Sequence, residues 1–338
     1  MKIVVVGATG FVGRALTGAL ADSGEDVRAA SRQPPRQERA DVRWVHCDLA
    51  RSETIAPALA DADVAYYLVH SMASTADFRD VDRRCAQDFA AAAATTTCRR
   101  IVYLGGVAPR GTPSEHLASR LEVGEILRAG AVPAIELRAS MIVGNGSASW
   151  QIMRDLAARL PFMVLPRWLE SRTCPIALAD VIDALLDARE VPLAASTWFD
   201  IPGPDVLTAR ELLEIVAALD GRRIPSLRVP VLTPALSALW LKLVSGADYS
   251  VGRELVLGLT EDLLPQKSFW EVTERPPRWS FRAAAAEALA TETPPSGLAG
   301  AVERLVRLTA RGASRGSRSG GRPASGSRTA GRRTGTAS

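Results

Sequence analysis

The 338-residue sequence has few of the residues that usually bind metals or form disulfides. It has four cysteines with no Cys-x-x-Cys pair, and its three histidines are not clustered. This pattern supports neither a metal site nor a disulfide framework, and it predicts buried or half-buried free thiols in a reducing, cytoplasmic compartment. A short strand and a glycine turn follow Met1 and Lys2 directly, so we expect no signal peptide.

Long apolar runs are also missing. The longest notable uncharged stretch, Val229–Leu241, has thirteen residues and is interrupted by Pro230 and Pro234. A membrane-spanning helix needs about 20 residues, so we expect no membrane span. The surrounding segment, Leu227–Val244, could lie on a membrane surface or close a substrate cavity, but leucines at helical spacing favour packing in a core.

Acidic residues are absent from residue 311 onward, where there are seven arginines. Residues 1–310 hold 34 basic and 37 acidic residues, a net charge of −3, although the whole chain carries +4. The Arg-, Gly- and Ser-rich composition predicts a disordered tail over 311–338. The tail could contact an acidic partner or nucleic acid. It has no aromatic residue for base stacking, so we favour a solvated tail and do not expect nucleic-acid binding.

The first 145 residues alternate regularly between strand-like and helical patterns. The predicted strands are Ile3–Val6, Val27–Ala30, Arg43–Val45, Val64–Val69, Ile101–Leu104 and Ala134–Leu137. The predicted helices are Phe11–Ser23, Ser52–Ala60, Ala76–Thr95 and Pro113–Ala129, the last capped by Thr112 and ended by Gly130. This alternation predicts an α/β fold, a Rossmann-type doubly wound parallel sheet with helices on both faces.

After about residue 150 the pattern becomes less regular. The expected elements are helices at Ser149–Arg159, Leu178–Arg189 and Ala235–Ser245, a capped amphipathic helix at Thr208–Leu219, a strand at Trp198–Ile201 and a further stretch at Val251–Leu264. These elements predict a smaller, mixed C-terminal lobe on the edge of the sheet. The expected division is a Rossmann domain over 1–175, a substrate-side lobe over 176–310 and the tail.

The strongest local motif, Gly7–Gly13, lies where the first predicted strand meets the first predicted helix. Gly7 permits a tight turn, Gly10 lets a pyrophosphate approach the backbone, and Gly13 lets the helix pack closely on the strand. The helix N-terminus adds unpaired N–H groups and the positive end of a dipole. We therefore predict a dinucleotide site formed by Gly7, Thr9, Gly10, Phe11, Val12 and Gly13.

The end of the second predicted strand distinguishes NAD from NADP. An acidic residue there would bind the ribose 2′-OH, whereas a basic residue accommodates a 2′-phosphate. The sequence has Ser31 and Arg32 there, then Arg36, and no acid before Glu38. Ser31 and Arg32 could hold a phosphate, which favours NADP(H) over NAD. The alternative is that Arg32 is a solvated surface residue.

Three further residues are expected at the cofactor. Asp48 and Leu49 follow the third predicted strand and are placed to meet the adenine, although Asp48 could equally cap its loop. Leu68 comes from the end of the fourth predicted strand.

Together these residues resemble the short-chain dehydrogenase/reductase superfamily in its extended and atypical branches. More narrowly, the chain is similar to the NmrA-like and NAD-dependent epimerase/dehydratase-like NAD(P)H-binding proteins. The stretches that carry the likeness are Gly7–Gly13, Tyr66–Met72, Ile101–Gly106, Ser114–Arg120, Leu137–Ser147, Pro175–Asp180 and Trp198–Pro204. They cover most of residues 1–290, and the tail lies outside the resemblance.

The resemblance implies a Tyr-x-x-x-Lys pair on a helix and a Ser or Thr after the fifth strand. The Tyr is the acid/base, the Lys lowers its pKa and holds the nicotinamide ribose, and the hydroxyl orients the substrate carbonyl. Here His116 and Arg120 stand where the family has Tyr and Lys, at a spacing that shares one helix face. The hydroxyl position falls at Gly105 or Gly106.

This departure has two interpretations. His116 could replace the Tyr as general acid, with Arg120 holding the ribose, although a permanently charged Arg cannot relay protons. The protein would then be an oxidoreductase acting on an unknown carbonyl-type small molecule. Alternatively His116 is structural and the protein is a catalytically silent NADP(H)-binding sensor or assembly protein. His70 is a second acid candidate or a structural histidine, and His46 is expected to be structural.

Overall fold

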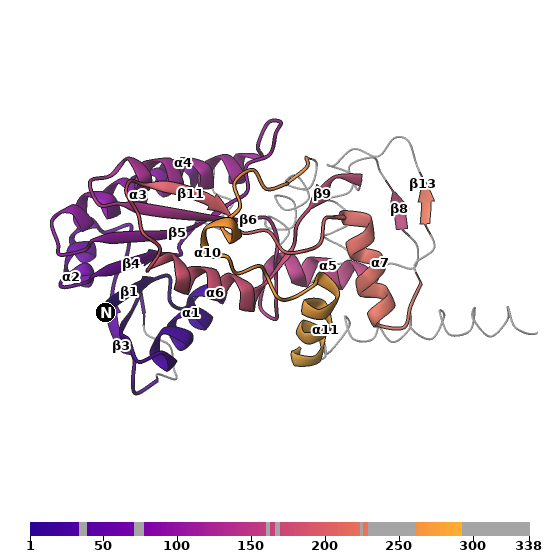
Figure 1. Cartoon of the computed structure of the whole chain (residues 1–338), viewed down its shortest axis with the longest axis horizontal. Coiled ribbons are helices and arrows are strands. Elements are labelled where there is room, and N and C mark those ends of the chain that lie inside the picture. Colours follow the sequence, from indigo (N-terminus) through magenta and orange to yellow (C-terminus); the bar gives the residue numbers. More distant parts are fainter. Residues whose placement is uncertain are drawn as a thin grey trace, which may run out of the picture.

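A seven-stranded, entirely parallel sheet forms the centre of the protein in the computed structural model (Figure 1). Its strands are β1 (Lys2–Val6), β2 (Asp26–Ser31), β3 (Arg43–His46), β4 (Val64–Tyr67), β5 (Arg100–Gly106), β6 (Ala134–Ala139) and β11 (Thr197–Asp200). Their order across the sheet is β11-β6-β5-β4-β1-β2-β3. The chain first builds outward from β1 to β3 and then returns to place β4 on the other side of β1. Ligands of such sheets bind outside the strand ends at this reversal point.

Helices cover both faces of the sheet because its strands alternate between two cores. Ile3 and Val5 pack into one cluster with α1 (Phe11–Asp22) and α6 (Leu178–Ala188). Val4 and Val6 face a second cluster, which includes residues of three helices on the other side of the sheet. Those helices are α2 (Ile55–Leu59), preceded by the short turn η1 (Ser52–Thr54), α3 (Phe78–Ala94) and α4 (Glu115–Ala129). The predicted doubly wound fold is confirmed.

A third cluster forms the smaller C-terminal lobe, in which Trp150 is fully buried. Its helices are α5 (Ala148–Arg159), α7 (Ala209–Leu219) and α11 (Phe281–Thr291). Short strands join them: β7 (Ile142–Val143), β8 (Met163–Leu165), β9 (Arg172–Thr173), β10 (Ile176–Ala177), β12 (Leu207–Thr208) and β13 (Ser226–Arg228), with the short helix α10 (Trp270–Thr273). The division at residue 175 stays a prediction, but two later elements belong to the Rossmann part: β11 is an edge strand of the central sheet, and α6 packs on one of its faces.

The ends of the helices show one error in the sequence-based prediction. Helix α4 begins at Glu115, and its N-cap is Ser114, whose hydroxyl accepts the Leu117 N–H at 3.4 Å. Thr112 is therefore not the cap, because the helix starts two residues later than predicted and its first N–H groups are out of reach. The predicted cap of α7 is confirmed, since Thr208 and Glu211 bond each other's backbone N–H groups.

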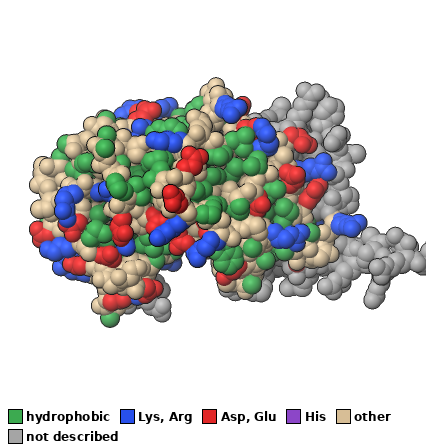
Figure 2. Space-filling view, in the orientation of Figure 1, with side chains coloured by type: hydrophobic (Ala, Val, Ile, Leu, Met, Phe, Trp, Pro, Cys, Tyr) green, Lys and Arg blue, Asp and Glu red, His purple; other side chains and the backbone are tan. Residues whose placement is uncertain are grey.

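The structure describes residues 1–33, 39–70, 78–159, 163–165, 170–223, 226–228 and 261–292. The predictions for Arg36, for the helix at Ala235–Ser245, for most of Val251–Leu264 and for the tail over 311–338 lie outside these residues. Charged side chains of both signs are spread over the face that Figure 2 shows. Within the described part of the chain, no helix has both the length and the apolar character of a transmembrane span.

Candidate functional site

The glycine turn after β1 has the geometry that its sequence predicts. Gly7 has a φ of +88°, and a Cβ there would lie 2.8 Å from the carbonyl oxygen of Leu68. A Cβ on Gly13 would lie 2.1 Å from the carbonyl oxygen of Gly7, so α1 packs directly on the turn. Gly10 is the N-cap of α1 and donates its N–H to Gly7 at 2.9 Å. Only glycine fits at Gly7 and Gly13, because backbone atoms occupy the space of any side chain.

The first residues of α1 connect this turn to the loop after β7. Thr9 and Gly10 are exposed, whereas Phe11 and Val12 are half-buried. A Cβ on Gly144 would lie 3.1 Å from the Phe11 ring, so the loop passes directly over the ring. The α1 N-terminus thus lies between the sheet edge and the start of the C-terminal lobe.

Among the described residues that follow β2, Arg32 presents an exposed basic side chain. The Ser31 hydroxyl donates its hydrogen to the carbonyl oxygen of Gln33 at 2.5 Å, so in this conformation it has no hydrogen left for a phosphate. The carbonyl oxygen of Arg32 lies 3.1 Å from Nδ1 of His46, which ends β3. The roles of Ser31 and Arg32 at a phosphate stay predictions, and the geometry favours Arg32.

The two residues expected at the adenine have local roles. The Asp48 carboxylate accepts the N–H of Ala50 at 3.2 Å, which is the loop cap that the sequence left open. Leu49 is buried in the core cluster on the α2 side of the sheet. Leu68, half-buried, donates its N–H to Val6 and lies directly against Gly7. Contacts of these residues with a cofactor stay predictions.

The predicted catalytic candidates meet at the carboxyl ends of β4 and β5. His70 follows β4, and His116 lies in the first turn of α4. Their ring centroids are 5.9 Å apart with the rings nearly perpendicular, and the Phe78 ring lies 5.9 Å from His116. Arg120, one helical turn after His116, completes the group. His70 and His116 are 46 positions apart in the sequence. Apart from their expected place at one edge of the sheet, nothing in the sequence indicated that the two rings would be neighbours.

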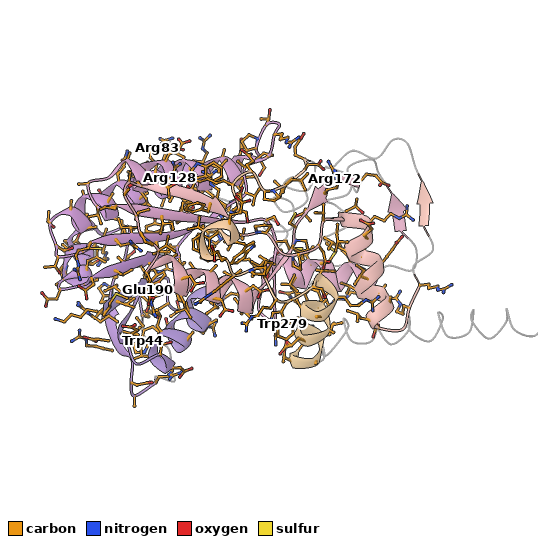
Figure 3. The ribbon with its side chains drawn as sticks, in the orientation of Figure 1. Trp44, Arg83, Arg128, Arg172, Glu190 and Trp279 are labelled. Carbon is orange, nitrogen blue, oxygen red and sulfur yellow. The ribbon has the colours of Figure 1, made fainter. Side chains whose placement is uncertain are left out.

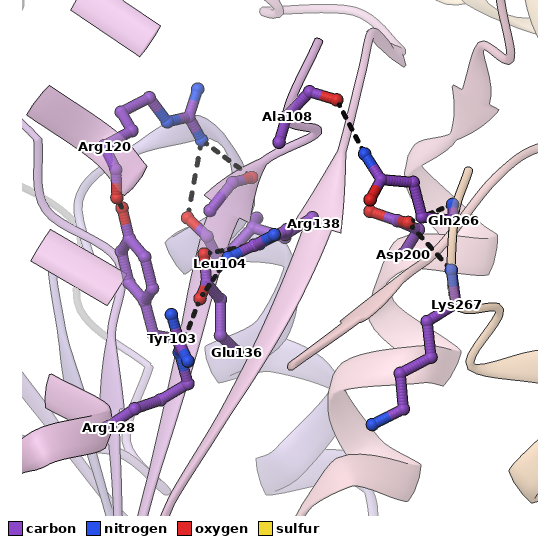
Figure 4. Close-up of polar contacts among 11 residues, drawn as sticks. Tyr103, Leu104, Ala108, Arg120, Arg128, Glu136, Arg138, Asp200, Gln266 and Lys267 are labelled. Atoms are coloured by element: carbon purple, nitrogen blue, oxygen red, sulfur yellow. Dashed lines mark hydrogen bonds and ion pairs between the residues drawn. The ribbon is translucent and has the colours of Figure 1, made fainter. Parts of the chain in front are cut away.

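The Arg120 side chain is held against the end of β5 (Figure 4). Its Nη2 donates to the carbonyl oxygens of Leu104, at 3.4 Å, and Gly105, at 3.2 Å. The Tyr103 hydroxyl donates to the Arg120 carbonyl oxygen at 2.9 Å, which fixes the helix over the strand. The guanidinium is therefore fixed beside the two histidines.

Both histidines are neutral at pH 7. Burial, together with the nearby Arg120 and His116, lowers the pKa of His70 to about 3. Burial and then Arg120 lower the pKa of His116 to about 4. The cause is that a charged imidazole would lose solvation and lie beside a permanent cation. At neutral pH these rings are therefore proton acceptors, so a general acid at His116 requires a lower pH.

The missing hydroxyl of the family pattern has a steric explanation. A Cβ on Gly105 would lie 2.6 Å from Oε1 of Glu136, and a Cβ on Gly106 would lie 2.6 Å from Cδ1 of Leu117. At either glycine where the family's Ser or Thr could fall, the space beside the backbone is therefore filled by another side chain of this protein.

Glu136 belongs to a buried ionic cluster that sequence reasoning missed. Its fully buried carboxylate accepts hydrogen bonds from Nε of Arg128, at 3.0 Å, and from Nε of Arg138, at 2.9 Å (Figure 4). Figure 3 labels Arg128 at α4. The Arg138 guanidinium also lies 4.2 Å from the centre of the Trp198 ring. This cluster ties α4, β6 and β11 together. The available signal was the pair Glu136 and Arg138, two charged residues on one face of a strand inside the sheet.

The residues present fit a dinucleotide. The glycine turn leaves open backbone at the N-terminus of α1, where phosphates bind. The Nε of Arg120 is buried and has no hydrogen-bond acceptor among the described residues. A buried, unsatisfied cationic N–H is costly, so its place beside the sheet edge suits a ligand oxygen.

Comparison with known proteins agrees with this geometry. Residues 3–131, from β1 to the end of α4, match the NAD dependent epimerase/dehydratase family. The dTDP-6-deoxy-L-talose 4-dehydrogenase (NAD(P)(+)) of Kitasatospora kifunensis is 27% identical over 65% of this chain and 79% of its own. The (4-alkanoyl-5-oxo-2,5-dihydrofuran-3-yl)methyl phosphate reductase of Streptomyces griseus is 28% identical over 86% of this chain and 100% of its own.

Solved structures share the fold at low identity. A nucleoside-diphosphate-sugar epimerase from Staphylococcus aureus aligns with a TM-score of 0.66 at 16% identity, over 85% of this chain and 100% of its own. The Bordetella bronchiseptica enzyme WbmH, solved with NAD+, aligns with a TM-score of 0.64 at 14% identity, over 86% and 97%. These structures confirm the Rossmann-type fold, and the family match over residues 3–131 agrees with the predicted resemblance.

Proposed function

Because residues 3–131 match the NAD dependent epimerase/dehydratase family and fold as a Rossmann-type sheet, we propose that the chain is an NADP(H)-dependent oxidoreductase acting on a carbonyl-type small molecule. The observation that carries the proposal is the meeting of His70, His116 and Arg120 at the same sheet edge as the glycine turn. The oxidoreductase relatives from Kitasatospora and Streptomyces support the reaction class.

Each part of the site has a distinct task in this proposal. Gly7 and Gly10 leave the backbone open to the pyrophosphate, and Arg32 pairs with the 2′-phosphate. Arg120 offers its free Nε–H to the nicotinamide ribose. The cofactor, when bound, supplies the hydride donor or acceptor.

His116 moves the proton, and its pKa sets the preferred direction. A neutral imidazole takes a proton from a substrate hydroxyl, which suits oxidation of an alcohol to a carbonyl at neutral pH. Reduction of a carbonyl needs the protonated ring, whose population rises as the pH falls toward the His116 pKa of about 4. His70 keeps the ring desolvated from the side of β4.

The cofactor assignment is tested by fluorescence titration of the protein with NADPH and NADH. We expect a clear preference for NADPH that collapses in Arg32→Glu, because the new carboxylate repels the 2′-phosphate. Arg282→Glu, which makes the same charge change at an exposed position of α11, should keep the preference. Absence of binding to either nucleotide by the unmodified protein would overturn the dehydrogenase assignment.

The catalytic assignment is tested by turnover with a panel of carbonyl compounds and alcohols. We expect reduction to accelerate as the pH is lowered from about 7 toward 4, and oxidation to slow over the same range, because only protonated His116 donates. His116→Ala should lower kcat about 10²–10⁴-fold with NADPH affinity unchanged. Full turnover by this variant would exclude His116 as the proton-transfer group.

A catalytically silent NADP(H)-binding protein is the second candidate. It is favoured by the closure of both hydroxyl positions by Glu136 and Leu117. Tight NADPH binding without turnover over the whole pH range, together with a protein that co-purifies, would support this candidate over the oxidoreductase.

A further inference from the structure

The turn after β2 is held by two side chains that come from two different strands. The Ser31 hydroxyl donates to the carbonyl oxygen of Gln33 at 2.5 Å. Nδ1 of His46 lies 3.1 Å from the carbonyl oxygen of Arg32. Two successive carbonyl groups around Arg32 are thus fixed by side chains, although the Arg32 side chain itself is exposed.

The pairing of β2 with β3 places His46 where it can do this. Ser31 and His46 are register partners, and the N–H of Cys47 donates to the carbonyl oxygen of Ser31 at 2.9 Å. A carbonyl oxygen can only accept, so Nδ1 of His46 carries the hydrogen in this contact. The sheet therefore fixes the His46 ring, and the ring fixes the backbone of Arg32.

We infer that His46 is a positioning residue for recognition of the cofactor's 2′-phosphate. By holding the Arg32 carbonyl, His46 keeps the Arg32 guanidinium at the carboxyl end of β2 and lowers the entropy lost when the phosphate binds. This inference rests on the proposed function, because it takes Arg32 to be the phosphate ligand. It replaces the sequence-based expectation that His46 has only a structural role.

The expected effect is selective for ligands that carry the phosphate. His46→Ala removes one hydrogen bond to the turn, so binding of 2′,5′-ADP should weaken about three- to tenfold, while binding of ADP stays unchanged. His46→Asn should retain most of the affinity, because its amide nitrogen can donate from nearly the same place as Nδ1. A role limited to folding would change both ligands alike.

The test is calorimetric titration of the full chain with 2′,5′-ADP and with ADP. The proteins are the unmodified chain, His46→Ala, His46→Asn, Arg32→Ala and the double variant His46→Ala/Arg32→Ala. We expect the loss in His46→Ala to disappear when Arg32 is already absent, because His46 acts through Arg32. Thermal unfolding should be similar in all five, since both side chains are exposed.

Two results would overturn the role of His46 while leaving the proposed cofactor intact. One is an unchanged ratio of 2′,5′-ADP to ADP affinity in His46→Ala. The other is a loss in His46→Asn as large as in His46→Ala, which would indicate a direct contact of the imidazole with the phosphate. If the unmodified chain binds both ligands equally, the proposed NADP(H) preference itself fails, and the role of His46 fails with it.

Discussion

The glycine turn and the start of α4 lie at the same edge of one sheet, yet only the turn follows the family pattern. The turn depends on backbone atoms: Gly7 and Gly13 are required because carbonyl groups occupy the space of a side chain. The α4 site depends on side chains, and His116 and Arg120 stand at the positions where the resemblance predicts Tyr and Lys.

The difference shows that the fold requires glycine where backbone atoms pack closely, whereas it permits different side chains at the start of α4. A Cβ on Gly13 would lie 2.1 Å from the carbonyl oxygen of Gly7, so only glycine fits there. Any other residue would disrupt the packing of the helix on the strand. The side chains around Arg120 could change together. Glu136 fills the space beside Gly105, Leu117 fills that beside Gly106, and the site is repacked around histidines instead of a hydroxyl.

The largest loss of stability is expected at the buried Glu136 carboxylate beside α4. Glu136→Ala should lower the free energy of unfolding by about 3–5 kcal/mol, because Arg128 and Arg138 would lose their buried counter-charge. The measurement is chemical denaturation, with Glu190→Ala as control. Glu190 is exposed, and its partner Arg189 keeps a second carboxylate partner in Glu25, so the loss of Glu190 should cost less than about 1 kcal/mol. Equal effects would show that the cluster does not hold this region together.

In α1, which follows the glycine turn, replacing two different glycines by alanine should change the stability of the protein in opposite directions. Gly13→Ala should destabilise the protein by about 3 kcal/mol and abolish NADPH binding, since its Cβ meets the backbone of the turn. Gly18→Ala should instead stabilise it by up to about 1 kcal/mol, because its nearest neighbour, at 3.6 Å, is the end of the Arg39 side chain. Thermal unfolding with and without NADPH measures both. Normal binding by Gly13→Ala would contradict the role of the turn.

Introducing a serine at Gly105 or at Gly106 tests how tightly the neighbouring side chains fill the space beside each glycine. Gly105→Ser should cost about 2 kcal/mol, because the Glu136 carboxylate that it meets is held by two arginines. Gly106→Ser should cost only about 1 kcal/mol, since the end of the half-buried Leu117 side chain can move. Denaturation of the two variants compares them directly. A larger loss of stability in Gly106→Ser than in Gly105→Ser would indicate that Leu117, and not Glu136, is the side chain that cannot move.

The smallest effect distinguishes the two possible caps of α4. Ser114→Ala should lower stability by about 1 kcal/mol, because the Leu117 N–H loses its acceptor. Thr112→Ala should have almost no effect, since Thr112 lies outside the helix. A loss confined to Thr112→Ala would restore the cap that the sequence predicted and would shift the start of the helix that carries His116.

Sequence reasoning succeeded where the signal is local. The β-branched run Ile3–Val6, the glycine turn and the Thr208 cap each depend on residues within a few positions of one another, and all three are confirmed. It failed for α4, because Thr112 and Ser114 are both acceptable caps and only packing of the helix on β5 selects one. The Glu136 cluster escaped detection although Arg128 and Arg138 are near it in sequence, because only the packing of α4 and β11 against β6 buries these charges together.

By itself, the sequence determined the alternation of strands and helices, the glycine turn after the first strand, and the presence of a histidine and an arginine, His116 and Arg120, four positions apart on one helix. These features follow from periodicity and from residue identity at short spacing. Only the tertiary structure decided that His70 reaches His116, that both rings are neutral at pH 7, and that His46 holds the backbone of Arg32. The physical reason is that burial, charge proximity and strand register are set by elements distant in sequence, which meet only when the sheet has formed.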